Sequence, residues 1–218
     1  MINLHNIELR ADGLYWPSYD KHCYEWTGVE VHACDVISTA CVQKRKMVSA
    51  GANVGAYALK YSSMFDTVYA FEPDNTNFRC LVLTTLNAPN VIKMQMALGS
   101  APSQISLSND TSTNCGTLAV SGHGTIPMVT LDSLFLHEID LIHLDAEGYE
   151  LFALMGAKET IKRCRPVIAY EWVGHCERYG INENQIIEFL ENLDYVPLGK
   201  VSSDVVFIHK ENHERKGK

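Results

Sequence analysis

A glycine-rich turn, followed about one helix later by an acid at the end of a strand, constrains this chain more than any other feature. The turn runs from Ser49 to Gly55, and the acid is Glu72, twenty-one positions after Gly51. Nucleotide sites in α/β sheets place a carboxylate on a ribose hydroxyl pair roughly 20 residues after such a turn. The pairing therefore predicts an α/β fold and an adenosine-containing ligand.

The length of the chain favours one domain. Its 218 residues, 46% of them hydrophobic, are enough for one sizeable core and few for two. We expect a single domain over residues 1–218, with a cap or lid segment and entry helix at 1–45, a core at 46–210 and a frayed tail at 211–218.

Charge and cysteine content exclude several functions. A formal net charge of −8 opposes nucleic-acid binding, which needs clustered Lys and Arg. The seven cysteines are odd in number and form no C-x-x-C pair, which favours a reduced, cytoplasmic compartment. No run approaches the roughly 20 apolar residues of a membrane span, and the first residues lack the basic and apolar regions of a secretory signal, so we expect none. We expect a cytoplasmic protein without a membrane span.

Strand and helix patterns alternate along the chain, which favours a parallel sheet flanked by helices. We expect an entry helix at 31–46, a helix after the glycine turn capped by Asn53, and a helix capped by Asp74 or Asn75. The polar stretch 99–125 is typical of a surface insertion with one extra strand. The remaining expected strands are 47–50, 67–71, 91–98, 126–130, 139–144 and 166–170, with 195–198 and 204–209 as a terminal pair.

The distinctive polar residues of the chain follow predicted strands. Gly51 and Asn53 follow the first strand, Glu72 ends the second, and acids follow two later ones. Ligands of open α/β sheets bind beyond the carboxyl ends of their strands. Because these residues converge on one edge, we expect a single site there.

The chain resembles S-adenosylmethionine-dependent methyltransferases of the FkbM family. The resemblance covers roughly residues 45–210, and its motifs occur in the family's order. They are VSAGANVG at 48–55, FEP at 71–73, TLD at 130–132, HLDAEGYE at 143–150 and RPVIAYE at 165–171. The resemblance implies a class I methyltransferase fold, a Rossmann-like three-layer sandwich with a seven-stranded, mostly parallel sheet and an antiparallel last strand. It also implies O-methylation of a small-molecule hydroxyl, often on a sugar.

The family pattern assigns S-adenosyl-L-methionine to the glycine turn and the strand ends. The glycines let the backbone pass close to the cofactor, and Glu72 would accept hydrogen bonds from both ribose hydroxyls. The cofactor-binding residues that this reading predicts are Ser49, Gly51, Asn53, Gly55, Glu72, Pro73, Ala97 and Asp145.

Methyl transfer to an alcohol needs a group that removes a proton, because a protonated hydroxyl is a poor nucleophile. The candidates are Asp145, Glu147, Glu171 and His175. The three carboxylates could also bind Mg²⁺, although a metal is not favoured because such a site has no fixed spacing. Glu150, one helical turn beyond Glu147, is predicted to be a structural acid.

Two residues depart from the family pattern. Ser49 stands where the family usually has an acid near the methionine ammonium, and His143 replaces a usual Lys. The first departure keeps a noncatalytic methyltransferase-like binding module as an alternative. A nicotinamide-dependent oxidoreductase is a weaker alternative, because Asn53 and Ala56 occupy two glycine positions of G-x-G-x-x-G.

Overall fold

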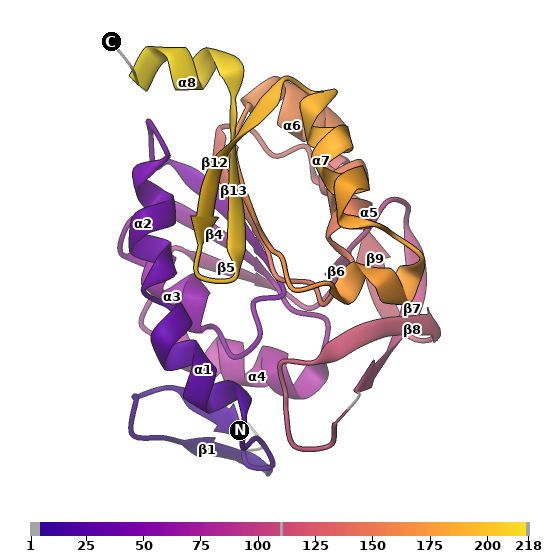
Figure 1. Ribbon diagram of the computed structural model, residues 1–218. Helices are drawn as coiled ribbons and strands as arrows, with labels where there is room; N and C mark the ends of the chain where they lie inside the picture. Colours follow the sequence, from indigo (N-terminus) through magenta and orange to yellow (C-terminus); the bar gives the residue numbers. More distant parts are fainter. Residues whose placement is uncertain (1–4, 110, 217–218) are drawn as a thin grey trace.

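The computed structural model describes residues 5–109 and 111–216, and a seven-stranded sheet forms its centre (Figure 1). The strands of this sheet are β3 (Lys46–Ala50), β4 (Thr67–Phe71), β5 (Val91–Met94), β10 (Ile139–Leu144), β11 (Val167–Glu171), β12 (Tyr195–Val201) and β13 (Asp204–His209). They lie in the order β12-β13-β11-β10-β3-β4-β5. Strand β13 is antiparallel to both of its neighbours, and the other pairs are parallel, which confirms the predicted sheet.

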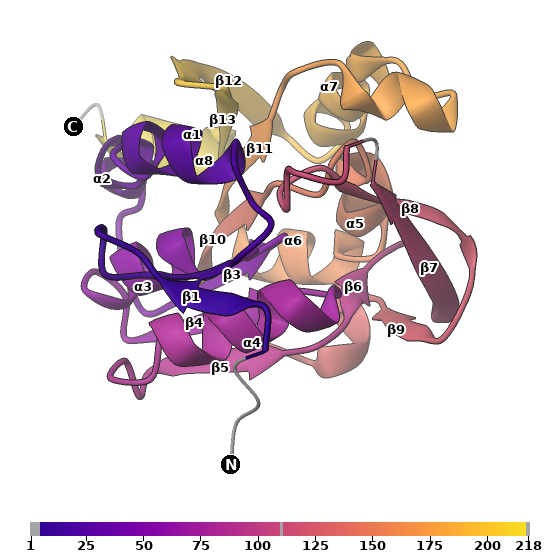
Figure 2. The same ribbon diagram turned by 90° about the horizontal axis from the view of Figure 1, so that it is seen from below.

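Helices cover both faces of this sheet (Figure 2). One core lies against α2 (Ala33–Thr39), α3 (Ala56–Ser62) and α4 (Asn75–Thr84), and the other against α5 (Glu150–Met155), α6 (Lys158–Cys164) and α7 (Glu183–Glu191). Successive strand residues face opposite sides of a sheet, and neighbours such as Met47 and Val48 enter different cores. The central strands are therefore apolar at nearly every position, and the three-layer sandwich is confirmed.

The entry helix differs from the expected one. A helix does form within 31–46, as α2, but it ends at Thr39, and an unpredicted helix, α1 (Cys23–Glu30), precedes it. The carboxylate of Asp20 accepts hydrogen bonds from the backbone N–H groups of Cys23 and Tyr24, so the first turn begins there. Before it, β1 (Ile7–Leu9) and β2 (Tyr15–Pro17) form an antiparallel pair.

A second sheet of four strands contains most of the polar insertion. Its order is β6-β9-β7-β8, with β6 (Ala97–Leu98), β7 (Ser103–Asn109), β8 (Leu118–His123) and β9 (Ile126–Val129). The expected strand 91–98 is therefore split, because β6 leaves β5 and pairs with β9. The expected single extra strand is also wrong, since both β7 and β8 lie within 99–125.

The predicted helix caps have mixed outcomes. Asp74 caps α4 by accepting from the N–H groups of Thr76 and Asn77, as expected. Asn53 does not cap α3, which begins after Gly55, because Asn53 has a left-handed backbone with φ 50°.

The predicted frayed tail instead includes α8 (Lys210–Lys216), with 217–218 outside the described residues.

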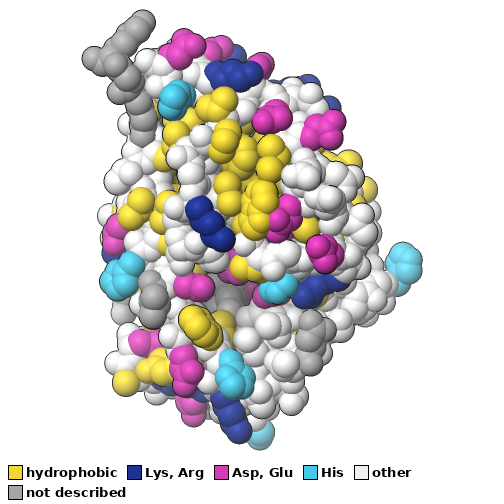
Figure 3. All heavy atoms as spheres, viewed as in Figure 1, with side chains coloured by type: hydrophobic (Ala, Val, Ile, Leu, Met, Phe, Trp, Pro, Cys, Tyr) yellow, Lys and Arg dark blue, Asp and Glu magenta, His cyan; other side chains and the backbone are white. Residues whose placement is uncertain are grey.

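Two short 3-10 helices complete the elements, η1 (Leu131–Leu134) and η2 (His175–Tyr179). Figure 3 shows hydrophobic side chains gathered over the β12–β13 edge of the sheet and toward α7. Among the helices that the structure describes, none has the length and apolar character needed to span a bilayer.

Candidate active site

A pocket of about 260 Å³ opens at the carboxyl ends of β3, β4, β10 and β11. Its floor includes the turn after β3 and the acid after β4, and its opposite wall includes residues that follow β10 and β11. Helix α1 and the loop before β8 close its sides. The pocket lies where an open α/β sheet is expected to bind its ligand.

The glycine turn and Glu72 form one hydrogen-bonded unit in this pocket. Glu72 accepts from the backbone N–H of Asn53 at 2.7 Å and from that of Asp74 at 2.8 Å, through its two different oxygens. Gly51 permits the close approach of β3 to β10, since a Cβ there would lie 1.6 Å from the carbonyl oxygen of Asp145. Burial raises the pKa of Glu72 to about 8, although the two N–H groups act in the opposite direction.

The residues of this end fit an adenosyl ligand. A carboxylate offers about four lone-pair sites, so Glu72 retains acceptor capacity for two ribose hydroxyls. Asn77 also lines the pocket and is buried, and its Oδ1 atom accepts no hydrogen bond from any described residue. A buried acceptor of this kind is normally satisfied, so the pocket wall is suited to a ligand with hydroxyl or amino donors.

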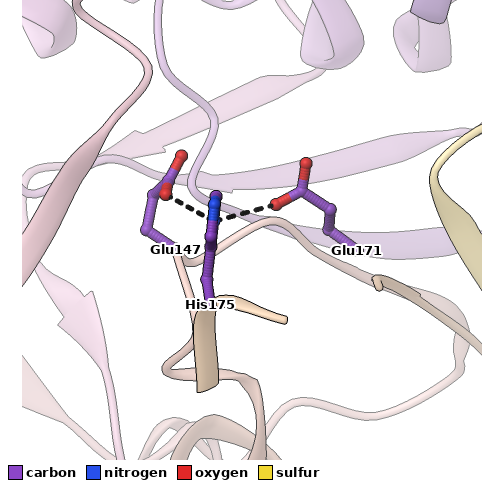
Figure 4. Close-up of side chains that lie close together, drawn as sticks. All are labelled: Glu147, Glu171 and His175. Carbon is purple, nitrogen blue, oxygen red and sulfur yellow. Dashed lines mark ion pairs between the residues drawn. The ribbon is translucent and has the colours of Figure 1, made fainter. Parts of the chain in front are cut away.

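At the other end of the pocket, an imidazole lies between two carboxylates (Figure 4). The Nδ1 atom of His175 is 2.8 Å from Oε2 of Glu147 and 3.9 Å from Oε2 of Glu171. Arg178 is the cation next to them, with a guanidinium nitrogen 3.9 Å from the same Glu147 oxygen. Of the three side chains in Figure 4, Glu147 lies in the turn after β10, Glu171 is the last residue of β11, and His175 is the first residue of η2.

Burial and mutual repulsion raise the pKa values of the acids at this end of the pocket. Burial first, and then the charge of Glu147, raise the pKa of Glu171 to about 8. Burial and the charge of Glu171 raise the pKa of Asp145 well above its ordinary value. Raised carboxyl pKa values of this kind are common at sites that move protons or bind cations.

The turn that carries Glu147 is held from below by Glu150. This acid is buried, and its Oε1 accepts from the N–H groups of Ala146 at 2.8 Å and Gly148 at 3.2 Å. Its predicted structural role fits this position, because Glu150 is the first residue of α5 and its side chain closes the turn before that helix.

His143 lies beneath the site inside β10. Its Nδ1 is 3.1 Å from the hydroxyl of Tyr61, its Nε2 is 3.3 Å from a carboxylate oxygen of Asp204, and the ring of Tyr57 stacks on it. Its side chain is buried, with 2% exposed. His143 is not among the residues that line the pocket.

The structure brings most of the predicted site residues together. Those that line the pocket are Gly51, Asn53, Glu72, Pro73, Ala97, Asp145, Glu147, Glu171 and His175. Ser49 and Gly55 are not part of the lining. Ser49 is buried within β3, and a Cβ at Gly55 would lie 2.8 Å from the side chain of Leu81, so this glycine serves the packing of α3 on α4.

Sequence reasoning missed the residues that α1 and the insertion contribute. Cys23, Trp26, Thr27 and Glu30 come from α1, Asn114 to Thr117 come from the insertion, and Tyr57 comes from α3. The side chain of Asn53 connects the first two groups, since its amide contacts the sulfur atoms of Cys23 and Cys115. The sequence did predict a cap or lid over residues 1–45 and an insertion at 99–125, but no local pattern singled out which of their residues would face the pocket.

The fold is that of class I methyltransferases. A family model, the methyltransferase FkbM domain, matches residues 49–197, so the chain belongs to this family of S-adenosylmethionine-dependent methyltransferases. A search of curated proteins found no match.

Solved structures share the fold at low sequence identity. A methyltransferase FkbM from Methylobacillus flagellatus KT is 18% identical with a TM-score of 0.52, over 76% of this chain and 44% of that one. A ribosomal protein L11 methylase from Lactobacillus delbrueckii subsp. bulgaricus is 9% identical, with a TM-score of 0.51 over 84% and 79%. Monomeric WbdD is 12% identical, with a TM-score of 0.50 over 87% and 42%. This chain thus spans less than half of the FkbM structure.

Proposed function

We propose that this chain transfers a methyl group from S-adenosyl-L-methionine to a hydroxyl group of a small molecule. The proposed acceptor is a sugar or a glycoconjugate. The observation that carries the proposal is the arrangement of one pocket, with the Glu72 unit at one end and Asp145, Glu147, Glu171 and His175 at the other. One end fits an adenosyl group, and the other offers proton acceptors where a methyl acceptor would bind.

The donor supplies an electrophilic methyl group when it is bound, and the chain's residues do the rest. Glu72 and the N–H groups of the glycine turn orient the ligand, while Pro73 and Ala97 border the adenosyl end. The proposed chemistry forms one oxygen–carbon bond and breaks one carbon–sulfur bond, with the electron pair going to sulfur. The hydroxyl proton goes to a carboxylate, and a reaction of this type depends mainly on positioning.

Asp145 is the proposed proton acceptor. Its backbone N–H donates to the carbonyl of Ala50 at 2.9 Å, so it is fixed beside the donor turn at the boundary between the two ends of the pocket. The other three side chains lie farther along the same wall. An aromatic ring at the rim, Trp26, is 65% exposed and is available to stack on the apolar face of a sugar.

We further propose that residues 1–45 act as a cap on one methyltransferase domain. Helix α1 contributes four residues to the pocket wall. Residues of β7 and β8, Leu107, Leu118 and Val120, also line the pocket, so we expect the acceptor to bind between α1 and these strands.

Calorimetry and a turnover assay test this function. Titration of the full chain with S-adenosylmethionine and S-adenosylhomocysteine should give saturable binding, and NAD should give none. Release of S-adenosylhomocysteine with a panel of monosaccharides, glycosides and simple alcohols should then identify hydroxyl acceptors, with amines as a comparison set. Binding without turnover on any acceptor would favour the noncatalytic module, and absence of donor binding would contradict both readings.

A further inference from the structure

Three ligand-type side chains converge on one point of the pocket wall. Oxygen atoms of Glu147 and Glu171 and a ring nitrogen of His175 all lie within 4.8 Å of one another (Figure 4). A first-row metal ion binds such atoms at about 2.0–2.2 Å, which leaves neighbouring ligand atoms about 3–4 Å apart. The observed separations from His175, 2.8 and 3.9 Å, already lie close to this range.

The two segments that carry these ligands are held by contacts outside the cluster. Besides the hydrogen bonds of Glu150 to the first segment, Glu183 accepts from the N–H of Gly174, the residue before His175, at 3.0 Å. The segments also touch at Gly148, where a Cβ would lie 2.4 Å from the backbone of His175. Supporting bonds of this kind orient metal ligands and tune their affinity.

We propose that Glu147, Glu171 and His175 bind one divalent first-row transition-metal ion of the Mn²⁺ type. Two carboxylates and one imidazole supply two negative charges and a nitrogen donor. Mg²⁺ and Ca²⁺ prefer oxygen ligands alone, whereas the absence of thiolate from this cluster separates it from structural zinc sites.

The role of the ion rests on the proposed function. Bound beside Asp145, it would hold the acceptor's hydroxyl oxygen and stabilise its deprotonated form, with the proton passing to Asp145. The competing explanation is an imidazolium that pairs with the two carboxylates, with Arg178 3.9 Å from Glu147 as a second cation, and this arrangement needs no ion. Both explanations satisfy the charges of the cluster, so a binding measurement must separate them.

The test is a titration of the full chain with Mn²⁺, without donor or acceptor. Binding is monitored as the loss of the EPR signal of the free ion. We expect one ion per chain. Replacing one ligand, in Glu171→Gln or His175→Gln, should weaken binding at least about tenfold, because even supporting residues contribute 10- to 100-fold. Mg²⁺ at equal concentration should leave the bound Mn²⁺ in place.

Glu177→Gln and His137→Gln are matched controls, because both side chains are exposed and lie outside the cluster. They should bind Mn²⁺ like the parent chain, and thermal unfolding should show that every variant is folded. An undiminished free-ion signal with the parent chain would overturn the proposal in favour of the imidazolium. Equal binding by parent and ligand variants, or displacement by equal Mg²⁺, would also overturn it. Donor binding is measured separately, so failure of the methyltransferase proposal would leave this result standing.

Discussion

The backbone N–H of Asn53 donates a hydrogen bond to Glu72 across 2.7 Å, which joins the turn after β3 to the acid after β4. The two strands are neighbours in register, with Ala50 opposite Phe71. One helix and one strand, α3 and β4, must therefore lie between the glycine turn and Glu72. Their combined length explains the spacing between the two motifs in the sequence. Asn53 at φ 50° presents its N–H toward the carboxylate instead of capping α3.

Glu72→Gln should weaken binding of S-adenosylhomocysteine by about 10- to 100-fold, because hydrogen bonds to a charged group contribute about 1.5–3 kcal/mol. The amide also places a donor against one of the two backbone N–H groups that now donate to Glu72. Calorimetry measures the affinity. Glu188→Gln, an exposed change on α7, should bind like the parent chain. Equal affinities for the two variants would remove Glu72 from the donor site.

The pH dependence of donor binding should follow the same carboxylate. Burial raises the pKa of Glu72 to about 8, so the pocket without ligand holds a proton below that pH. Ribose hydroxyls donate to the ionised form, and binding must then release the proton. Affinity should rise up to about tenfold per pH unit between about pH 6 and pH 8, and level off above.

Calorimetry in buffers of different ionisation enthalpy measures the proton release directly. Glu72→Gln should abolish both the release and the slope. A flat profile in the parent chain would show that Glu72 does not titrate on binding.

Gly51→Ala should destabilise the fold by about 2–4 kcal/mol, through overpacking and a left-handed backbone at φ 75°. The new Cβ would lie 1.6 Å from a carbonyl oxygen of β10's following turn, so the strands would have to separate. Gly28→Ala is the control, since Gly28 is exposed on α1 and a Cβ there would meet nothing within 4 Å. It should be neutral or stabilise the fold by up to about 1 kcal/mol. Chemical denaturation of both variants checks this, and similar losses in the two would contradict it.

The sequence predicted the central sheet well because most of its strands are short apolar runs that end at a polar residue or a glycine. The strand 67–71 matches β4 at both ends. Prediction from the sequence failed where contacts between residues far apart in the chain determine the structure. The start of α1 depends on Asp20, and the second sheet depends on β6 pairing with β9 some thirty positions later. The wall that α1 adds to the pocket depends on contacts of Asn53 with Cys23 and Cys115, which no local pattern encodes.

Asp132 shows that a family motif can be structural. In TLD, its two carboxylate oxygens accept from the N–H groups of Thr160 at 2.7 Å and Glu159 at 2.9 Å, at the start of α6. Asp132→Ala should cost about 1–2 kcal/mol of unfolding free energy while donor affinity stays unchanged. Denaturation and calorimetry on one preparation measure both, and a fall in affinity at full stability would place Asp132 in the site instead.

Asp145→Asn tests the proposed proton acceptor. The amide keeps the size of the side chain, and the backbone bond to Ala50 is unaffected, so folding and donor affinity should remain. Turnover should fall about 100-fold or more, because a positioned base contributes about 10²- to 10⁴-fold. Steady-state release of S-adenosylhomocysteine measures the change, with exposed Glu177→Gln as the matched control. Unchanged turnover in Asp145→Asn would exclude Asp145 as the base. Loss of donor binding would instead assign it to the cofactor end, because a side chain between the two ends of the pocket can serve either one.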